Sequence, residues 1–465
     1  MRMKNRLISA VLTICILTGV CLTGLSVSAA YTPDFAVNSE IALLVDLESE
    51  KVIYSKEPDK PWYPASLAKI MTCLITLEQI PDEELSTTMM TASVDVYNEL
   101  YGQGASSAGI EVGDTTSALD LLYGLMLPSG CETALILADN IGQGDTYEER
   151  TSDFVRMMNE KAQELGCSEQ TRFMNAHGLH DPDQMVTAND LWKILKYAIE
   201  TYDRFLEIST ALTYTMHATG KNGETRDISI SHSNYMLREK MYGEDNKYYS
   251  PYVQGIKTGT LDAAGRNLVT MGSDKGVSYI LITMGAPSKY ENGDPIADNL
   301  SFLDHKNLFN WVFKSFELKT VYEKSSTAAQ ISVSLAKDKD TLLLNPSDDV
   351  MVLLPKNVEL SSVQKLPHLP ETIEAPVEKG QQIGTMDLKL NDEVIATVPL
   401  VASETIERSG FLYAMHQIKG FFGSLWFKIA LAVIVAFLII YVLLIIRYNR
   451  KKRRRKNRVY PRRPL

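Results

Sequence analysis

The amino-acid sequence predicts a protein of the α/β class in its α+β form: an antiparallel sheet flanked by helices, then a small all-β domain, then a C-terminal transmembrane helix. Three observations carry this prediction. β-type runs lie at both ends of a helical region, a proline-broken β-type region covers residues 320–402, and an uncharged apolar run covers residues 429–446. The 465 residues, 45% hydrophobic and 22% charged, suffice for two packed domains with accessory segments.

The N-terminus has the plan of a secretory signal. Three basic residues precede an apolar run over residues 7–25, and five small residues follow. We therefore expect a signal peptide over residues 1–30, cleaved after Ala29 or Ala30. An uncleaved anchor is the alternative.

The first domain is expected over residues 31–318. Short β-type runs at 40–46 and 51–55 predict a hairpin, and runs at 266–271 and 277–284 predict another. Because strands flank the helices on both sides, one sheet completed by both ends of the domain is expected. The apolar periodicity predicts helices over 67–77, 116–127, 132–141, 147–165, 188–200 and 302–316.

Four parts are predicted after the first domain. Residues 319–405 form an all-β domain, because their β-type segments show no helical period, and residues 406–424 form a linker or interfacial segment. The next apolar run has 18 uncharged residues, about 27 Å as a helix, so residues 425–446 are expected to span a bilayer. A cationic cluster follows, and the positive-inside rule places residues 447–465 in the cytoplasm and the preceding domains outside the plasma membrane.

Charge and cysteine usage exclude some functions. Of the 47 Lys and Arg residues, 11 lie in the tail and 3 in the signal, while none of the 57 Asp and Glu residues lies in either, so the remaining chain carries a formal net charge of −24. Such a surface does not suit nucleic acid, and a small peptide is the expected partner.

Three cysteines survive signal removal, so no complete disulfide framework is expected. The seven histidines lack ligand-type spacing, and no metal or cofactor is predicted.

The tetrapeptide SLAK at residues 66–69 is the first candidate for chemistry. It places the Ser66 hydroxyl and the Lys69 amine on one helical face, near the positive end of the helix dipole. Apolar surroundings disfavour the ammonium, so a neutral Lys69 can accept the serine proton. S-x-x-K arises roughly twice by chance in a chain this long. An identical copy at residues 334–337 lacks the apolar helix and is the internal control for coincidence.

Two further motifs follow in order along the chain. Ser129-Gly130-Cys131 comes after a predicted helix, and KTGT at residues 257–260 leads into a predicted strand pair. S-x-x-K, S-x-N and K-T-G are signatures of penicillin-binding proteins and serine β-lactamases. The chain resembles the D-alanyl-D-alanine carboxypeptidases, the low-molecular-mass penicillin-binding proteins of peptidase family S11. The stretches that carry this resemblance are YPASLAKIMT at 63–72, LPSG at 127–130, NAHGL at 175–179, GIKTG at 255–259, and residues 376–385 and 398–401 of the all-β region.

This resemblance implies a serine β-lactamase/transpeptidase-like fold and an acyl-transfer reaction. Ser66 would attack the D-Ala-D-Ala carbonyl, Lys69 would act as general base, and Ser129 would relay the proton to the leaving amine. The substrates implied are peptidoglycan stem peptides, from which the terminal D-alanine is removed. β-Lactam antibiotics would be covalent inhibitors.

The resemblance also implies a substrate-binding strand over the K-T-G motif and Gly259. Lys257 would place positive charge beside Ser129 and the substrate carboxylate, which Thr258 would hydrogen-bond. The backbone N–H groups of Ser66 and Thr260 would form the oxyanion hole.

Cys131 departs from the pattern, because the family's motif carries there an asparagine that orients the acyl side chain of the substrate. Cysteine is a poor substitute donor, and the lost hydrogen bond costs on the order of 1 kcal/mol, so slower or altered catalysis is expected rather than inactivity. A thiol nucleophile at Cys131 is the sharper alternative to a small buried side chain. His177 is expected in a turn with a hydrogen-bonded side chain, and residues 232–234 could line the cleft.

Two other functions stay open, and a third is disfavoured. A D,D-endopeptidase would use the same acyl-enzyme on a different leaving group. A class A β-lactamase is disfavoured by the missing E-x-x-L-N segment, the second domain and the anchor. A non-catalytic wall-binding or sensor protein is motivated by Cys131 and the basic tail.

Overall fold

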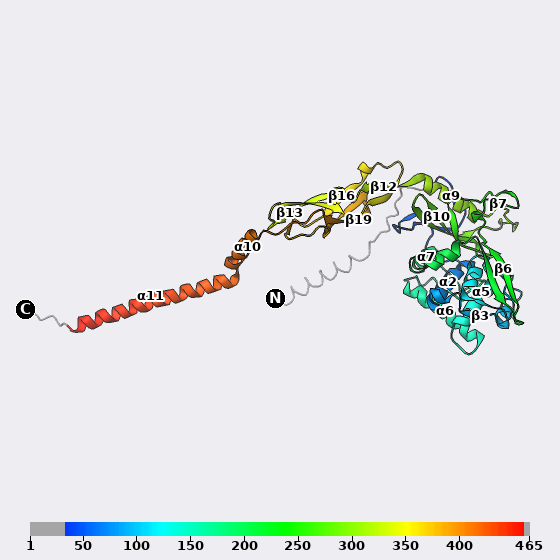
Figure 1. Cartoon of the computed structure of the whole chain (residues 1–465), viewed down its shortest axis with the longest axis horizontal. Coiled ribbons are helices and arrows are strands. Elements are labelled where there is room, and N and C mark those ends of the chain that lie inside the picture. Colours follow the sequence, from blue (N-terminus) through cyan, green and yellow to red (C-terminus); the bar gives the residue numbers. More distant parts are fainter. Residues whose placement is uncertain (1–32, 460–465) are drawn as a thin grey trace, which may run out of the picture. The chain divides into compact units, whose positions relative to one another are not determined.

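The computed structural model describes residues 33–459, without the side chains of 454–459. The predicted signal over residues 1–30 lies outside the described residues. Two compact units are present, the first ending at Lys314 and the second beginning at Ser315 (Figure 1). Each is described by itself.

The first unit is built on a five-stranded antiparallel sheet with the order β2-β1-β11-β10-β9. Strand β1 pairs with β11 from Ile41 opposite Met284 to Asp46 opposite Tyr279, so the two ends of the unit complete one sheet, as predicted. All six residues of β1 are buried, which explains its unbroken apolar run. The strands are β1 (Ile41–Asp46), β2 (Val52–Lys56), β9 (Val253–Leu261), β10 (Gly265–Asp274) and β11 (Val277–Ala286).

Helix α2 lies at the centre of the helical part. It contacts α4, α5, α6, α7 and α8, and its residues from Ala68 to Leu77 are all buried. Side chains of Ser117 and Thr187 cap α4 and α7, and Thr146 with Glu149 forms a capping box at α6. The helices are α2 (Ala68–Gln79), α3 (Val94–Leu100), α4 (Ala118–Met126), α5 (Cys131–Ile141), α6 (Tyr147–Glu164), α7 (Ala188–Thr201), α8 (Asp203–Thr210) and α9 (Leu300–Ser315).

All six helices expected from the sequence are present, with ends shifted by a few residues, whereas α3, α8 and a second sheet were missed. That sheet has the order β3-β4-β5-β6. Its hairpin β5-β6 buries Met216, Ala218 and Ile230 but exposes Thr, His and Asp side chains between them, so its apolar pattern is weak. The strands are β3 (Met89–Thr91), β4 (Thr115–Ser117), β5 (Thr213–Thr219), β6 (Thr225–Ser231), and a small hairpin of β7 (Lys240–Met241) and β8 (Glu244–Asp245).

The second unit begins with an all-β region, which confirms this part of the predicted fold class. A six-stranded sheet has the order β16-β18-β19-β14-β13-β17, and β12 pairs separately with β15. The strands are β12 (Phe316–Tyr322), β13 (Ala329–Ser334), β14 (Thr341–Pro346), β15 (Val350–Pro355), β16 (Gln364–His368), β17 (Thr372–Glu374), β18 (Gln382–Leu390) and β19 (Glu393–Ala402).

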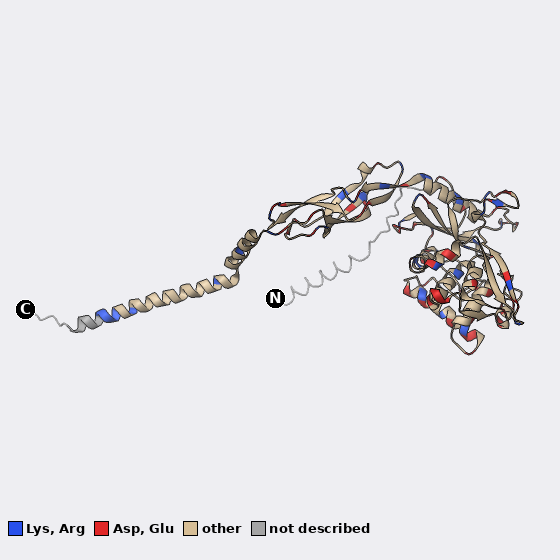
Figure 2. Cartoon of the chain, in the orientation of Figure 1, with Lys and Arg blue, Asp and Glu red and all other residues tan. Residues whose placement is uncertain are grey.

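Two helices follow this β region. Helix α10 (Gly410–Gly423) lies within the predicted linker and exposes Phe411, Phe421 and Phe422. Helix α11 (Leu425–Val459) contains a stretch from Leu425 to Arg453 that is long and apolar enough to cross a membrane. Its cationic residues gather at the C-terminal end (Figure 2). A single long apolar helix of this kind suggests a membrane anchor.

Candidate active site

The first motif lies where a short 3-10 turn (Ala65–Leu67) leads into α2. Ala65 has a φ of +49°, in the left-handed region that residues other than glycine rarely adopt. One turn of helix separates Ser66 from Lys69, so their side chains meet, with 3.2 Å between Ser66 Oγ and Lys69 Nζ. Ser66 is half-buried whereas Lys69 is fully buried, so solvent has access to the hydroxyl rather than to the amine.

The Lys69 amine has two further neighbours. The carbonyl oxygen of His177 accepts a hydrogen bond from Nζ at 2.5 Å, and Cys131 Sγ lies 3.4 Å from it. Burial lowers the pKa of Lys69, and the neighbouring Cys131 and Glu132 partly counteract this lowering. The arrangement therefore favours a neutral amine next to a hydroxyl, which is the requirement for a general base.

The second motif joins α4 to α5. Ser129 has a φ of +69°, and its buried Oγ forms no hydrogen bond within the part of the chain that has described side chains. Ser106 donates to the Ser129 carbonyl oxygen at 2.5 Å, and its hydroxyl lies 3.6 Å from Cys131 Sγ. The structure thus brings Cys131 against the Ser66–Lys69 pair and leaves the Ser129 hydroxyl free for another partner.

The third motif lies on strand β9. Lys257 is fully buried, and its Nζ donates to the carbonyl oxygen of Thr258 at 3.0 Å. Burial lowers the pKa of Lys257 well below its usual value, and the neighbouring Lys69 amine acts in the same direction. The hydroxyl of Thr258 lies 2.7 Å from that of Ser233, and Thr260 is exposed.

Gly259 lets strand β9 run directly against the Ser66 turn. A Cβ atom at this position would lie 3.2 Å from both Ser66 N and the carbonyl oxygen of Pro64, closer than nearly all real Cβ contacts. The first and third motifs are therefore adjacent in space, although almost 200 residues separate them in the sequence.

Asn267, on the neighbouring strand β10, holds the same turn. Its amide donates to the carbonyl oxygens of Tyr63 at 2.9 Å and Pro64 at 3.0 Å, and its oxygen accepts from Gly285 N at 2.9 Å. Nothing local in the sequence marks this asparagine, because its partners come from two distant segments.

Glu132 is a second residue that sequence reasoning missed. Its Oε1 accepts hydrogen bonds from Ser107 Oγ and from the N–H groups of Ala108 and Gly109, at 2.7, 2.5 and 3.0 Å. It thereby holds the loop that carries Ser106. Its place directly after the second motif was the only available signal.

His177 lies in a turn with a hydrogen-bonded side chain, as predicted. Nδ1 accepts from Leu179 N at 3.0 Å, and Nε2 lies 3.1 Å from Glu99 Oε1. Gly178 has a φ of +82°, and a Cβ there would lie 2.1 Å from the Ala65 carbonyl oxygen, so this turn packs on the Ser66 backbone.

In the segment 232–234, the hydroxyl of Ser233 reaches that of Thr258 in the third motif, at 2.7 Å. His232 and Asn234 are buried, and Asn234 Nδ2 donates to the carbonyl oxygen of Gly255 at 2.7 Å. Among the described residues, no group of three or more His, Cys, Asp or Glu side chains is placed to hold a metal ion.

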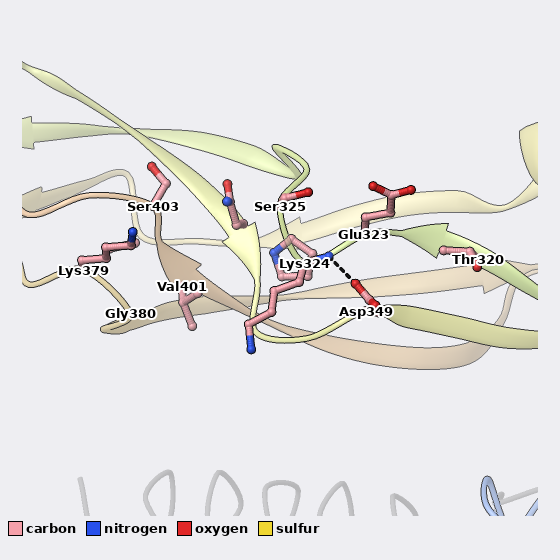
Figure 3. A pocket seen from close by; sticks show the side chains of 12 residues that line it. Thr320, Glu323, Lys324, Ser325, Asp349, Lys379, Gly380, Val401 and Ser403 are labelled. Carbon is pink, nitrogen blue, oxygen red and sulfur yellow. Dashed lines mark hydrogen bonds between the residues drawn. The ribbon is translucent and has the colours of Figure 1, made fainter.

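A hollow of about 730 Å³ lies in the second unit, far along the chain from these motifs (Figure 3). The main-chain N–H of Lys324 donates to Asp349 across it at 2.7 Å. Of the residues that line it, neither Ser325 nor Ser403 has a hydrogen bond from a lysine side chain. It therefore contains no pair comparable to Ser66 and Lys69.

Models of two protein families match the chain. One, described as D-alanyl-D-alanine carboxypeptidase, peptidase S11, matches residues 26–288. The other, described as penicillin-binding protein 5, C-terminal domain, matches residues 316–408.

Individual proteins are similar to the chain over most of its length. The D-alanyl-D-alanine carboxypeptidase DacF of Bacillus subtilis is 26% identical, over 84% of this chain and 91% of that relative. DacC of Escherichia coli, of the same description, is 28% identical over the same shares. The crystal structure of penicillin-binding protein 5 from Haemophilus influenzae has a TM-score of 0.60 and 25% identity, covering 81% of this chain and 100% of that one. The Streptomyces K15 DD-transpeptidase has a TM-score of 0.53 and 25% identity, covering 61% and 99%.

Proposed function

Because the chain belongs to the D-alanyl-D-alanine carboxypeptidase family, we propose that it removes the terminal D-alanine of peptidoglycan stem peptides through an acyl-enzyme on Ser66. One observation carries the proposal: the Ser66 hydroxyl lies 3.2 Å from the amine of a fully buried lysine, and burial lowers the pKa of that lysine. A nucleophile and a neutral base are thus within hydrogen-bond reach.

In the acylation step the Lys69 amine takes the proton of the Ser66 hydroxyl while Oγ attacks the carbonyl carbon of the penultimate D-alanine. The negative charge that develops on the carbonyl oxygen is stabilised by the backbone N–H groups of Ser66 and Thr260. The close approach of β9 to the Ser66 turn at Gly259 supports this pairing of two N–H groups from different segments.

Collapse of the tetrahedral intermediate breaks the peptide bond and releases D-alanine. The nitrogen of the released D-alanine receives the proton that Lys69 took from Ser66, relayed through Ser129, whose unpartnered hydroxyl is available for this step. The terminal carboxylate is held by the hydroxyl of Thr258 and by Lys257, whose ammonium form the negative charge of the bound carboxylate favours. Water then attacks the Ser66 ester, which releases the shortened peptide and restores the serine hydroxyl.

Cys131 borders the acyl side chain of the substrate in this proposal, in the place of the asparagine of the family's motif. The Cys131 thiol lies 3.4 Å from the Lys69 amine, the same group that is proposed as the base for Ser66. We therefore assign the nucleophile to Ser66. The catalytic unit acts outside the plasma membrane, with a signal over residues 1–30 directing export, α11 as the single span and the basic tail in the cytoplasm.

The proposal is tested by incubating the detergent-solubilised full chain with a fluorescent penicillin and identifying the labelled residue by mass spectrometry. A β-lactam mimics the D-Ala-D-Ala end in this mechanism, so a stable adduct on Ser66 is expected. An adduct on Cys131 would reassign the nucleophile. No adduct would favour a wall-binding or sensor protein, whose cellular role would survive Ser66→Ala.

The same acyl-enzyme can serve a D,D-endopeptidase, and a related solved structure is described as a DD-transpeptidase. Linear pentapeptides, cross-linked peptides and an added acceptor amine separate the three reactions by their products. We expect free D-alanine from the linear peptide as the main product.

A further inference from the structure

Glu99 belongs to none of the sequence motifs, yet it contacts the turn that lies against Lys69. It is near the C-terminal end of α3, and its Oε1 lies 3.1 Å from Nε2 of His177. Its other carboxylate oxygen accepts a hydrogen bond from the Tyr147 hydroxyl at 2.6 Å. Helix α3 is thus linked to Lys69 through a single intermediate residue, His177.

Both nitrogens of the His177 ring are used, and this determines where its proton lies. Nδ1 accepts from the main-chain N–H of Leu179 at 3.0 Å, so the ring proton is on Nε2 and is donated to Glu99. Burial lowers the pKa of His177, and a second proton would have to displace the Leu179 hydrogen bond. Burial alone would raise the pKa of Glu99, but hydrogen bonds from His177 and Tyr147 hold it below its usual value. The pair is a neutral imidazole and a carboxylate.

The surroundings of Nζ decide in which direction a neutral Lys69 offers its lone pair. A neutral amine has two N–H groups and one lone pair. The His177 carbonyl oxygen can only accept, so it takes one N–H, and Cys131 Sγ, a weak acceptor at 3.4 Å, is placed for the other. The lone pair then faces Ser66 Oγ at 3.2 Å. A displaced carbonyl oxygen would leave the amine free to turn away from the serine.

We propose that Glu99 is a positioning residue for acylation: by holding the neutral His177 ring, it keeps the His177 carbonyl oxygen against Lys69 and so directs the Lys69 lone pair at Ser66. The inference rests on the proposed function, in which Lys69 is the base. The turn has other supports, because Thr72 Oγ1 donates to the carbonyl oxygen of Ala176 at 2.6 Å. Loss of Glu99 therefore shifts the carbonyl oxygen without unfolding the turn.

The test is the second-order rate constant for acylation of Ser66 by a fluorescent penicillin, measured on the full chain in detergent. Glu99→Ala is expected to slow acylation about 10- to 100-fold, the usual cost of small displacements of a catalytic group. Glu99→Gln retains an acceptor oxygen for His177 Nε2–H and should recover most of the rate. Asp95→Ala, on the same helix α3, is the matched control and should acylate like the wild type.

The pH profile separates positioning from a loss of folded protein. A carbonyl acceptor favours the ammonium form of Lys69, so a displaced carbonyl lowers the pKa of Lys69. The acid limb of the acylation profile should therefore move to lower pH in Glu99→Ala while the plateau falls. The other titratable or charged groups that act on Lys69 stay the same in every variant: Cys131, Glu132, His177 and Lys257.

Three results would overturn the inference: Glu99→Ala acylating at the wild-type rate, Glu99→Gln as slow as Glu99→Ala, or a lower plateau with an unmoved acid limb. If Glu99→Ala does not fold, Tyr147→Phe carries the same test, because it removes only the hydroxyl that holds the second oxygen of Glu99. Its acid limb should move in the same direction. A wild-type chain that is not labelled at Ser66 would instead overturn the proposed function itself.

Discussion

The hydroxyl of Ser233 lies 2.7 Å from the hydroxyl of Thr258, which joins the loop after β6 to the K-T-G strand. Ser233 comes from a segment that the sequence motifs do not include, and it orients the side chain proposed to bind the substrate carboxylate. The proposed substrate site therefore draws on four segments rather than three.

Ser233→Ala should weaken substrate binding more than it slows chemistry. Loss of one net hydrogen bond, about 1 kcal/mol, corresponds to a rise of about 5-fold in KM for a peptide ending in D-Ala-D-Ala, with kcat nearly unchanged. Steady-state kinetics measure both constants. Ser231→Ala, exposed on β6, is the control, and an unchanged KM in Ser233→Ala would contradict the prediction.

Lys69→Ala and Lys337→Ala test which SLAK tetrapeptide carries the chemistry. Lys337 forms an exposed ion pair with Glu407 at 3.2 Å, and Ser334 ends strand β13 with its hydroxyl donated to the Ile373 carbonyl oxygen. Removal of a general base costs about 10²- to 10⁴-fold, so Lys69→Ala should almost abolish penicillin acylation. Lys337→Ala should acylate at the wild-type rate. Equal effects would mean that the wrong tetrapeptide was chosen.

Cys131→Ala should shift the pH dependence of acylation. Burial lowers the pKa of Lys69 and Cys131 partly opposes this, so removal of the thiol lowers the pKa of Lys69 further. The amine then stays neutral to lower pH, and the acid limb of the acylation profile moves to lower pH. Cys167→Ala, away from Lys69, is the control. A limb that moves to higher pH would show that Cys131 does not act on Lys69 in this way.

Lys257→Met should stabilise the first unit while it weakens substrate binding. The folded-state pKa of Lys257 lies well below its unfolded value. Between these two pKa values Lys257 is protonated in the unfolded chain but not in the folded one. Lys257 therefore lowers the free energy of unfolding at neutral pH, and this destabilisation fades as pH rises toward about 10. Methionine keeps a long apolar side chain at this buried position and removes the amine, so this cost disappears in the variant. Thermal melts should show a higher melting temperature for Lys257→Met than for the wild type at pH 7 and a smaller difference at pH 10. A melting temperature below that of the wild type at pH 7 would contradict the prediction.

Truncation should separate anchoring from orientation. A chain that ends at Ser424 lacks α11 and should become extractable from membranes by alkaline carbonate, with at most peripheral binding through α10. A chain that ends at Ile446 retains the apolar span and should resist extraction, although the cations that favour one orientation are gone. Protease protection of the C-terminus reports the orientation. Carbonate extraction of the full chain would contradict the anchor.

Residues on regular, strongly patterned elements were predictable. Ser66 and Lys69 stand one helical turn apart, so a helix alone brings them together, and the two β-type runs at 40–46 and 51–55 indicated the β1-β2 hairpin. Asn267 and Glu99 could not be found in this way, and Ser233 was expected only as part of a segment, residues 232–234, that could line the cleft. Each acts through hydrogen bonds to segments that are remote in the sequence, and the polar strands of β5-β6 were missed because only one of their faces is buried.

The sequence by itself determined the order of the three motifs, the two domain types and the long apolar C-terminal helix, because each depends on local spacing, periodicity or composition. Only the tertiary structure decided that strand β9 passes against the Ser66 turn at Gly259, that Cys131 reaches the Lys69 amine, and that the His177 carbonyl oxygen completes its surroundings. These contacts join segments that approach only when the two ends of the chain's first unit close one sheet. Their distances depend on packing, which no local pattern encodes.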